Sequence, residues 1–313
     1  MNASASRTGD NNELREFLRS RRARVTPEEA GLTPSATVRR VPGLRREEVA
    51  QLAGVSVDYY VRLERGRRPN VSESVLEAIA RALRLTADER QYLFALVKPV
   101  RTRPRVPAPQ RVRPALYRVL ESMADTPALV IGRRTDVLAT NRLARALYAD
   151  FDAMPRRERN LARFTFLDAR ARALYADWTA VAQAAVAALR VYAGDHPYDP
   201  QLAELIGELS LRDADFRHWW AAHDVQRRTY GSKLFRHPLV GDLYLDYEAL
   251  AVTGDPEQIL GVYTAEPGSP SAEALGLLAG WTADTAAGPR RRGDTAERMS
   301  TVATPRTRPP GTP

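Results

Sequence analysis

The sequence predicts two domains of different fold class, a helical N-terminal domain and an α+β C-terminal domain. Residues 1–98 place apolar residues at helical spacing around a glycine turn, whereas later residues combine a long helical pattern with short alternating segments. Between them, residues 99–114 hold too many prolines for a helix or inner strand, because each proline removes a backbone donor and restrains its predecessor. We expect this segment to be an extended linker.

Charge and composition narrow the class of protein. The 313 residues carry a net charge of +9 and include no cysteine, which excludes disulfides and thiolate sites and favours a cytoplasmic location. Residues 1–115 hold 23 of the 47 basic but 13 of the 38 acidic residues, so the positive excess lies at the front. We expect a polyanionic partner there, although 45 of the basic residues are arginine, a bias that a GC-rich genome also produces. No signal peptide or membrane-spanning run is recognisable, so we expect no membrane partner.

Residues 45–66 have the pattern of a helix-turn-helix. Gly54 supplies the left-handed turn after a helix at 46–53, and Ser56 can cap the next helix by accepting hydrogen bonds from its first amides. Tyr60 and Leu63 then face inward. Helices at 13–24, 72–84 and 87–97 complete a five-helix helix-turn-helix domain over residues 13–98, after a disordered N-terminus at 1–12.

This segment resembles the helix-turn-helix of the phage-repressor-like, xenobiotic-response-element (XRE) family of transcription regulators. The family's opening Gly-Leu-Thr-Gln-Glu-Glu-Leu-Ala is represented by residues 43–50, Gly-Leu-Arg-Arg-Glu-Glu-Val-Ala. Arg45 replaces the capping threonine, and Arg46 replaces a glutamine that commonly touches DNA, so Arg46 is expected to grip a phosphate instead of a base. The resemblance implies a double-stranded DNA operator and the following groove-facing residues: Val57, Asp58, Tyr59 and Arg62.

The side chains at these positions suit base recognition. Arg62 can fork onto guanine, Asp58 can accept from the cytosine amino group, and Val57 can contact a thymine methyl. We expect Ser56 at the start of this helix, and Arg65, Arg67 and Arg68 beyond it, to contact the DNA, the arginines through phosphates. The alternative for Arg62 is a solvated surface residue. One such domain reads too few base pairs for selectivity, so we expect a homodimer.

The C-terminal region is predicted to be an antiparallel sheet with helices. Short apolar segments at 128–131 and 137–140 form a hairpin, and alternating residues at 242–250 and 259–264 form further strands. Between them we expect a long helix at 171–193 that Gly194 closes, and helices at 199–210 and 213–229. A last helix begins at residues 269–270, and residues 283–313 are expected to be a disordered tail.

Several short runs in this region resemble the ligand-binding domain of MmyB-like regulators. They begin at Tyr230 (Tyr-Gly-Ser-Lys), His237 (His-Pro-Leu-Val-Gly-Asp-Leu) and Tyr263 (Tyr-Thr-Ala-Glu-Pro-Gly-Ser). The resemblance covers residues 115–282 and implies a PAS-like domain with an apolar cavity, which in some relatives can hold a fatty acid.

Aromatic and polar side chains of this region are the candidates for contacts with such a guest. They are Trp178, Trp219, Trp220, Phe235 and Tyr244, which would enclose it, and His223, Arg227, Tyr230 and Lys233, which would bind its head group. The alternative is that these polar groups satisfy buried backbone or face water.

No metal, cofactor or catalytic site is predicted. His218 and His223 do not share a helix face, and no phosphate-binding glycine loop or nucleophile elbow occurs. We therefore expect a ligand-responsive, sequence-specific transcription regulator and not an enzyme. The alternative is a constitutive DNA-binding regulator whose C-terminal domain only dimerises or binds a protein partner.

Overall fold

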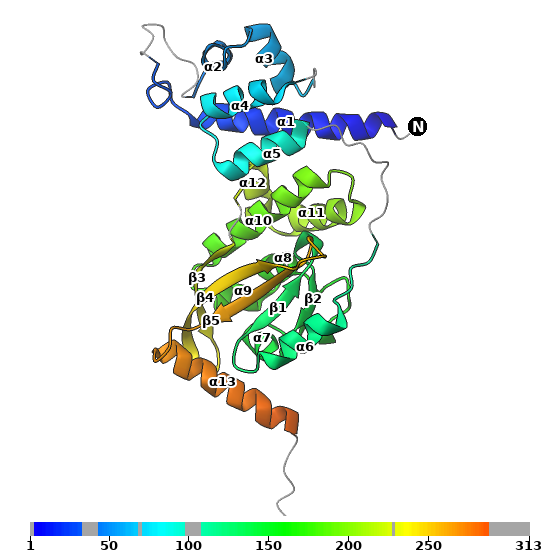
Figure 1. Cartoon of the computed structure of the whole chain (residues 1–313), viewed down its shortest axis with the longest axis vertical. Helices are drawn as coiled ribbons and strands as arrows, with labels where there is room; N and C mark the ends of the chain where they lie inside the picture. Colours follow the sequence, from blue (N-terminus) through cyan, green and yellow to red (C-terminus); the bar gives the residue numbers. More distant parts are fainter. Residues whose placement is uncertain (1–2, 33–42, 68–70, 98–107, 227–228, 288–313) are drawn as a thin grey trace, which may run out of the picture.

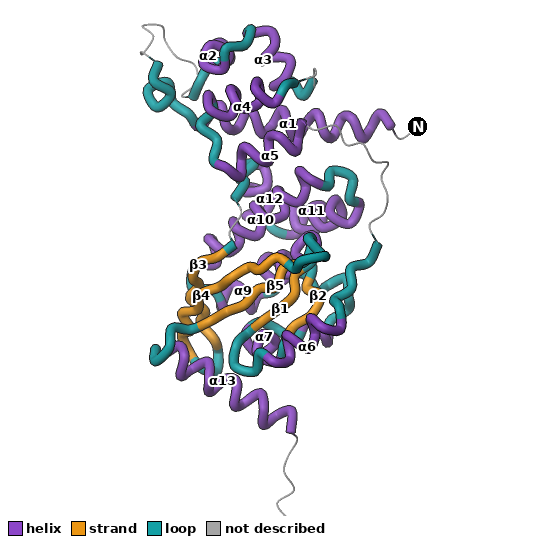
Figure 2. Tube along the Cα trace, viewed as in Figure 1, coloured by secondary structure: helices purple, strands orange, loops and turns teal. Residues whose placement is uncertain are grey.

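The computed structural model describes residues 3–32, 43–67, 71–97, 108–226 and 229–287, with side chains from residue 12 to residue 282 of those ranges. Five helices form the N-terminal domain, and the C-terminal domain combines helices with one antiparallel sheet, as predicted (Figures 1 and 2). The fold class is therefore α followed by α+β.

The N-terminal domain packs its helices around one apolar core. Its centre includes Phe17, Val49, Tyr60, Ile79 and Leu93, each fully buried. The helices are α1 (Ala3–Arg24), α2 (Arg46–Ala53), α3 (Val57–Glu64), α4 (Glu73–Ala82) and α5 (Ala87–Val97).

The first helix begins earlier than the sequence predicts. We expected disorder over residues 1–12, but α1 starts at Ala3. Leu14, Phe17 and Leu18 anchor the helix in the core, and no proline precedes them in α1. Once such a turn is fixed, each added residue gains a backbone hydrogen bond, which allows the helix to extend toward the N-terminus.

The C-terminal domain is built on a five-stranded sheet with strand order β2-β1-β5-β4-β3 and antiparallel pairing throughout. The strands are β1 (Ala128–Ile131), β2 (Val137–Thr140), β3 (Tyr230–His237), β4 (Gly241–Ala251) and β5 (Ile259–Thr264). The short 3-10 helix η1 (Arg133–Thr135) joins β1 to β2. The hairpin at 128–140 and the strands β4 and β5 agree with the predicted ones.

Eight α-helices accompany this sheet in the described part of the chain, most of them inserted between β2 and β3. They are α6 (Pro114–Ser122), α7 (Arg142–Leu147), α8 (Leu161–Leu167), α9 (Ala169–Leu174), α10 (Trp178–Asp195), α11 (Pro200–Arg212), α12 (Ala214–Ala221) and α13 (Pro270–Ala287), with a second 3-10 helix, η2, at Phe151–Ala153. In Figure 1, α10, α11 and α12 lie between the N-terminal helices and the sheet.

The predicted long helix at 171–193 is in fact two helices. It breaks at residues 175–177, where the backbone turns to β3: Ala176 N–H donates to the Leu234 carbonyl, and Tyr175 forms a bridge with Phe235. Asp177 then caps α10 by accepting from Ala180 N–H. Gly194 does not end this helix, which continues to Asp195.

Strand β3 was not predicted, and the helix expected at 213–229 ends at Ala221. Gly231, Ser232 and Lys233 give β3 a low strand propensity, but its backbone pairs with β4 from Tyr230 to His237. At the ends of the domain, α13 runs five residues beyond the predicted boundary at 282. Residues 108–113 precede α6 and place Val112 in a small apolar cluster, whereas residues 99–107 of the predicted linker lie outside the described residues.

Candidate functional site

The turn between α2 and α3 has the geometry of a helix-turn-helix. Gly54 adopts a left-handed conformation with φ of 64° and ψ of 32°. Ser56 caps α3 by accepting a hydrogen bond from Tyr59 N–H over 3.2 Å, as predicted. Tyr60 and Leu63 are fully buried, which fixes the side of α3 that faces the core. The opposite side of α3 is therefore presented to the outside.

The outward side of α3 carries most of the predicted groove-facing residues. Val57, Asp58 and Arg62 are exposed, while Tyr59 is half-buried. Arg62 Nη2 lies 3.0 Å from Asp58 Oδ2, one helical turn earlier. An exposed pair of this kind contributes little to stability, so either side chain can exchange its partner at low cost.

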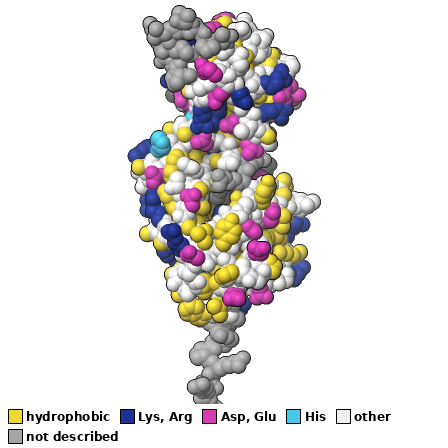
Figure 3. All heavy atoms as spheres, turned by 90° about the vertical axis from the view of Figure 1, so that its left-hand side faces the viewer, with side chains coloured by type: hydrophobic (Ala, Val, Ile, Leu, Met, Phe, Trp, Pro, Cys, Tyr) yellow, Lys and Arg dark blue, Asp and Glu magenta, His cyan; other side chains and the backbone are white. Residues whose placement is uncertain are grey.

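Arginines continue beyond this helix. Arg65 and Arg67 are exposed, whereas Arg68 lies outside the described residues. On the face drawn in Figure 3, dark-blue basic side chains occur on both domains, and yellow apolar ones cover much of the C-terminal domain. Residues 3–32, 43–67 and 71–97 hold 14 basic and 13 acidic residues, so most of the positive excess counted over residues 1–115 lies outside these helices, chiefly in residues 98–115.

Arg46, which was expected to contact a DNA phosphate, also pairs with a carboxylate of the protein that the sequence did not indicate. Its Nη2 lies 2.9 Å from Glu64 Oε1, and Arg22 Nε lies 2.9 Å from Glu64 Oε2. Burial raises the pKa of Glu64, but hydrogen bonds from the two guanidinium groups outweigh that effect and lower it. The buried carboxylate of Glu64 therefore links α3 to α1 and α2, and Arg46 is one of the two arginines that pair with it.

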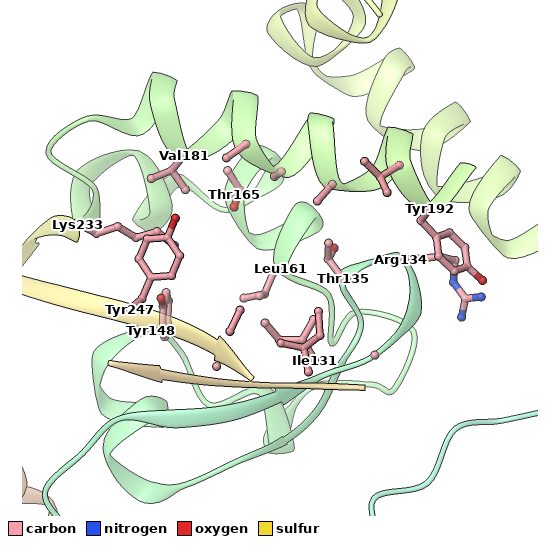
Figure 4. Close-up of a pocket in the computed structure, with 18 of the residues that line it drawn as sticks. Ile131, Arg134, Thr135, Tyr148, Leu161, Thr165, Val181, Tyr192, Lys233 and Tyr247 are labelled. Atoms are coloured by element: carbon pink, nitrogen blue, oxygen red, sulfur yellow. The ribbon is translucent and has the colours of Figure 1, made fainter. Parts of the chain in front are cut away.

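A cavity of about 870 Å³ lies between α10 and the sheet of the C-terminal domain (Figure 4). One side of α10 contributes small and apolar residues, and strands β1, β4 and β5 contribute the facing wall. The α10 residues include Val181, Ala184, Ala188 and Val191, and the strand residues include Ile131, Tyr247, Ile259 and Tyr263. The alanines of α10 leave this space open because a methyl group reaches only a short way from the helix.

Lys233 is the cation best placed to bind a guest in this cavity. Its Nζ lies 4.5 Å from the ring centroid of Tyr247 and 3.4 Å from Tyr263 Oη. Within the described residues, no carboxylate forms an ion pair with Lys233. Arg134, which also lines the cavity, already has two carboxylate partners. Its Nη1 lies 2.6 Å from Asp199 Oδ2, and its Nη2 pairs with Asp136. An anionic group entering here would meet Lys233.

The structure brings few of the sequence-predicted ligand residues to the cavity. Among the eight that it describes, Lys233 lines the cavity and the other seven do not. Trp178, Trp219 and Trp220 pack against the apolar core of helices α8 to α12, where their rings fill the spaces between the helices. Arg227 lies outside the described residues.

The remaining predicted ligand residues lie in three other places. Phe235 is fully buried in the sheet core, because β3 turns this side chain inward. Tyr230 and Tyr244 are exposed, being on the outward side of β3 and β4. His223 is buried beside the N-terminal domain. The signal that could have located the lining was the repeat of small residues on one side of residues 180–188.

No helix in the described part of the chain is both long and apolar enough to cross a membrane. The same residues hold no group of three or more His, Asp or Glu side chains placed to bind a metal ion.

A helix-turn-helix with an exposed second helix, joined to a domain with a largely apolar cavity, defines a DNA-binding transcription regulator. Comparison with family models agrees: residues 13–93 match a helix-turn-helix domain, and residues 112–278 match the MmyB-like transcription regulator ligand binding domain. The chain belongs to the MmyB-like regulator family, because that match spans more than half of it. Among curated proteins, none matches the chain.

Proposed function

We propose that this protein is a sequence-specific transcription regulator whose DNA binding responds to a small apolar ligand with an acidic head, such as a long-chain fatty acid. The observation that carries the proposal is the cavity beneath α10, with its apolar walls and one unneutralised cation, Lys233. Its volume lies within the range of about 300–1,000 Å³ typical of small-molecule sites. The antiparallel sheet with inserted helices supports a PAS-like domain.

DNA recognition is assigned to the outward side of α3, in the manner of XRE-family regulators. Arg62 pairs with guanine after exchanging Asp58 for the base, and Val57 contacts a thymine methyl. Tyr59 and the N-terminus of α3 at Ser56 lie next to them. Flanking arginines, Arg65 and Arg67 among them, contact phosphates without reading sequence.

Two further features belong to this proposal. The protein acts as a homodimer on a two-fold operator in the cytoplasm, with half-sites about one helical turn apart. Light scattering of the free protein and of its DNA complex tests the dimer, and a one-to-one complex on an asymmetric site would contradict it.

Arg46 supports α3 through Glu64 more than it reads DNA, because its guanidinium already binds that buried carboxylate.

The experiment for the ligand uses delipidated full-length protein and palmitate. A bound guest stabilises the folded state by mass action, so palmitate raises Tm in proportion to the logarithm of its concentration above Kd. Operator affinity is measured in the same titration. If palmitate and related acyl compounds leave Tm unchanged, the acyl assignment is wrong. If Tm rises while operator affinity stays constant, the protein binds DNA constitutively.

A further inference from the structure

Helix α10 contributes both to the cavity wall and to the contact with the DNA-binding domain. One side lines the cavity through Val181, Ala184 and Ala188. A neighbouring side, one to two turns further along, contacts the DNA-binding domain at α5 and α1. Figure 1 shows the same arrangement, with α10 below the N-terminal helices and above the sheet. A helix is a rigid element, so a shift at one side is carried to the other.

A buried polar cluster joins α10 to α1. The side chain of Arg190 is fully buried, and its Nη1 donates to Glu13 Oε2 over 2.8 Å. The same Nη1 lies 2.9 Å from His223 Nδ1, and Nη2 donates to the Trp220 carbonyl. Tyr92 Oη also donates to Glu13 Oε2, over 3.2 Å. Glu13 thus accepts hydrogen bonds from both domains.

The apolar side chains between α10 and the DNA-binding domain are tightly packed. A Cβ added to Gly194 would lie 2.5 Å from Cε2 of Tyr92, so the ring rests directly on the α10 backbone. Val191 lines the cavity and also packs against the core of the DNA-binding domain. One side chain therefore contacts both the space for a guest and the domain that binds DNA.

From this junction the contacts continue toward the recognition helix. Tyr92 meets Phe17 of α1 edge-on, with ring centroids 5.1 Å apart. Five residues along α1, Arg22 holds Glu64 at the end of α3. A continuous series of packed and hydrogen-bonded groups thus runs from α10 through α1 to α3.

We propose that α10 transmits the state of the cavity to the DNA-binding domain, with the Arg190–Glu13 pair and the Gly194–Tyr92 contact as the connection. The inference rests on the cavity being the regulatory site, as proposed above. A guest that pushes on the alanine side of α10 displaces Val191 and Arg190 with the helix. Because the junction is tightly packed, the two domains then adopt a different relative arrangement, and two DNA-binding domains in a dimer fit the operator differently. Only such a difference between arrangements can change operator affinity.

The test replaces the guest by a side chain, so that it does not depend on the ligand's identity. Ala184→Phe fills part of the cavity, and Gln183→Phe places the same bulk at an exposed position of α10 that does not line it. The operator affinity of each full-length variant is measured. Each variant is tested by itself and together with Glu13→Gln, which removes the charge at the junction. Glu16→Gln, an exposed-pair variant on α1, is the matched control background.

The inference predicts that Ala184→Phe changes operator affinity by about fivefold or more, in the range of ordinary allosteric coupling. Gln183→Phe changes it less than twofold, and Glu13→Gln, unlike Glu16→Gln, reduces the effect of Ala184→Phe to less than twofold. An Ala184→Phe effect that is equal in both backgrounds, or no larger than that of Gln183→Phe, overturns the inference.

Palmitate separates this inference from the proposed function. If palmitate changes operator affinity equally in wild type and in Glu13→Gln, the proposed function holds and transmission through this junction is wrong. If Ala184→Phe acts through Glu13 while palmitate does not bind, the junction transmits and the acyl ligand is wrong. Should Ala184→Phe fail to fold by circular dichroism, the comparison of palmitate effects in the Glu13→Gln and Glu16→Gln proteins decides the inference.

Discussion

Arg190 and Glu13, 177 residues apart in the chain, form a hydrogen-bonded ion pair across the boundary between the two domains. Arg190 is fully buried, and its guanidinium also stacks on the Trp220 ring at 3.9 Å. A buried guanidinium is tolerated only where its partners compensate the lost hydration. The pair is thus one of the contacts that join α1 of the DNA-binding domain to α10.

Removing this guanidinium should loosen the domain contact. Arg190→Met removes the donor to the Trp220 carbonyl and leaves Glu13 with only the Tyr92 hydroxyl, so we expect a loss of about 1–3 kcal/mol in the free energy of unfolding. Hydrogen exchange at α1 and α5 should rise with it. Arg15→Met is the control, because Arg15 is exposed and pairs only with its neighbour Glu16. Equal stability of the two variants in urea denaturation would contradict the role given to Arg190.

His223 should make this contact sensitive to acid. Burial, together with the positive charges of Arg190 and Arg21, lowers the pKa of His223 from its ordinary 6.5 to about 3. Glu13 and Asp224 lie close to the same cluster. Between pH 6.5 and 3 the unfolded chain binds a proton that the folded protein does not, so stability falls as pH falls, by up to about 1.4 kcal/mol per unit.

The histidine variants isolate this contribution. His223→Gln keeps a hydrogen-bonding side chain but cannot take up the proton, so the decline of Tm between pH 7 and 5 should be shallower than in wild type. His218→Gln, at an exposed position of α12, should leave the decline unchanged. Parallel Tm curves for all three proteins would show that folding does not lower the pKa of His223.

Arg62 and Arg67 should differ in what they contribute to DNA binding. Arg62→Ala should weaken binding to the specific site by about 1–3 kcal/mol and relax the preference at one base pair, because it removes a base contact. Arg67→Ala should weaken all sequences alike and lower the slope of log affinity against log salt by about one. Titrations on cognate and random duplexes at several salt concentrations distinguish them, and identical behaviour of the two variants would contradict the placement of α3.

Lys233 should select for an acidic head group. Lys233→Met removes the charge from the cavity but preserves most of its apolar stem, so palmitate affinity should fall about tenfold or more, as for a lost charge-assisted hydrogen bond. The affinity for hexadecanol, which has the same chain without the charge, should change little. Arg236→Met, at an exposed position of the same strand, is the control. Calorimetric titration of both lipids checks this, and equal losses for them would mean that Lys233 only shapes the wall.

The extent of sequence-based prediction differs between the two sites. The helix-turn-helix was predictable because its signals are local: a left-handed glycine at 54, a capping Ser56, and buried Tyr60 and Leu63 at helical spacing. The cavity was not predictable in the same way. Trp178, Trp219 and Trp220 were natural candidates for a wall, but they fill the space between helices instead.

The walls of the cavity depend on contacts between distant segments. Tyr247 and Tyr263 meet Lys233 only because β3, a strand of low intrinsic propensity, pairs with β4. Likewise, nothing local to Arg190 or Glu13 indicates that they meet. Alternation and helical spacing report which side of an element is buried, but not what lies opposite.

Coupling between the cavity and the operator must be reciprocal, so the effect of DNA on ligand binding tests it most directly. The Kd of palmitate for the full-length protein is measured by calorimetry with and without a saturating operator duplex, using a random duplex as control. Linkage requires the operator to change palmitate affinity by the same factor by which palmitate changes operator affinity, and we expect a factor of about five or more. Identical palmitate Kd values with operator, with random DNA and without DNA would contradict the claim.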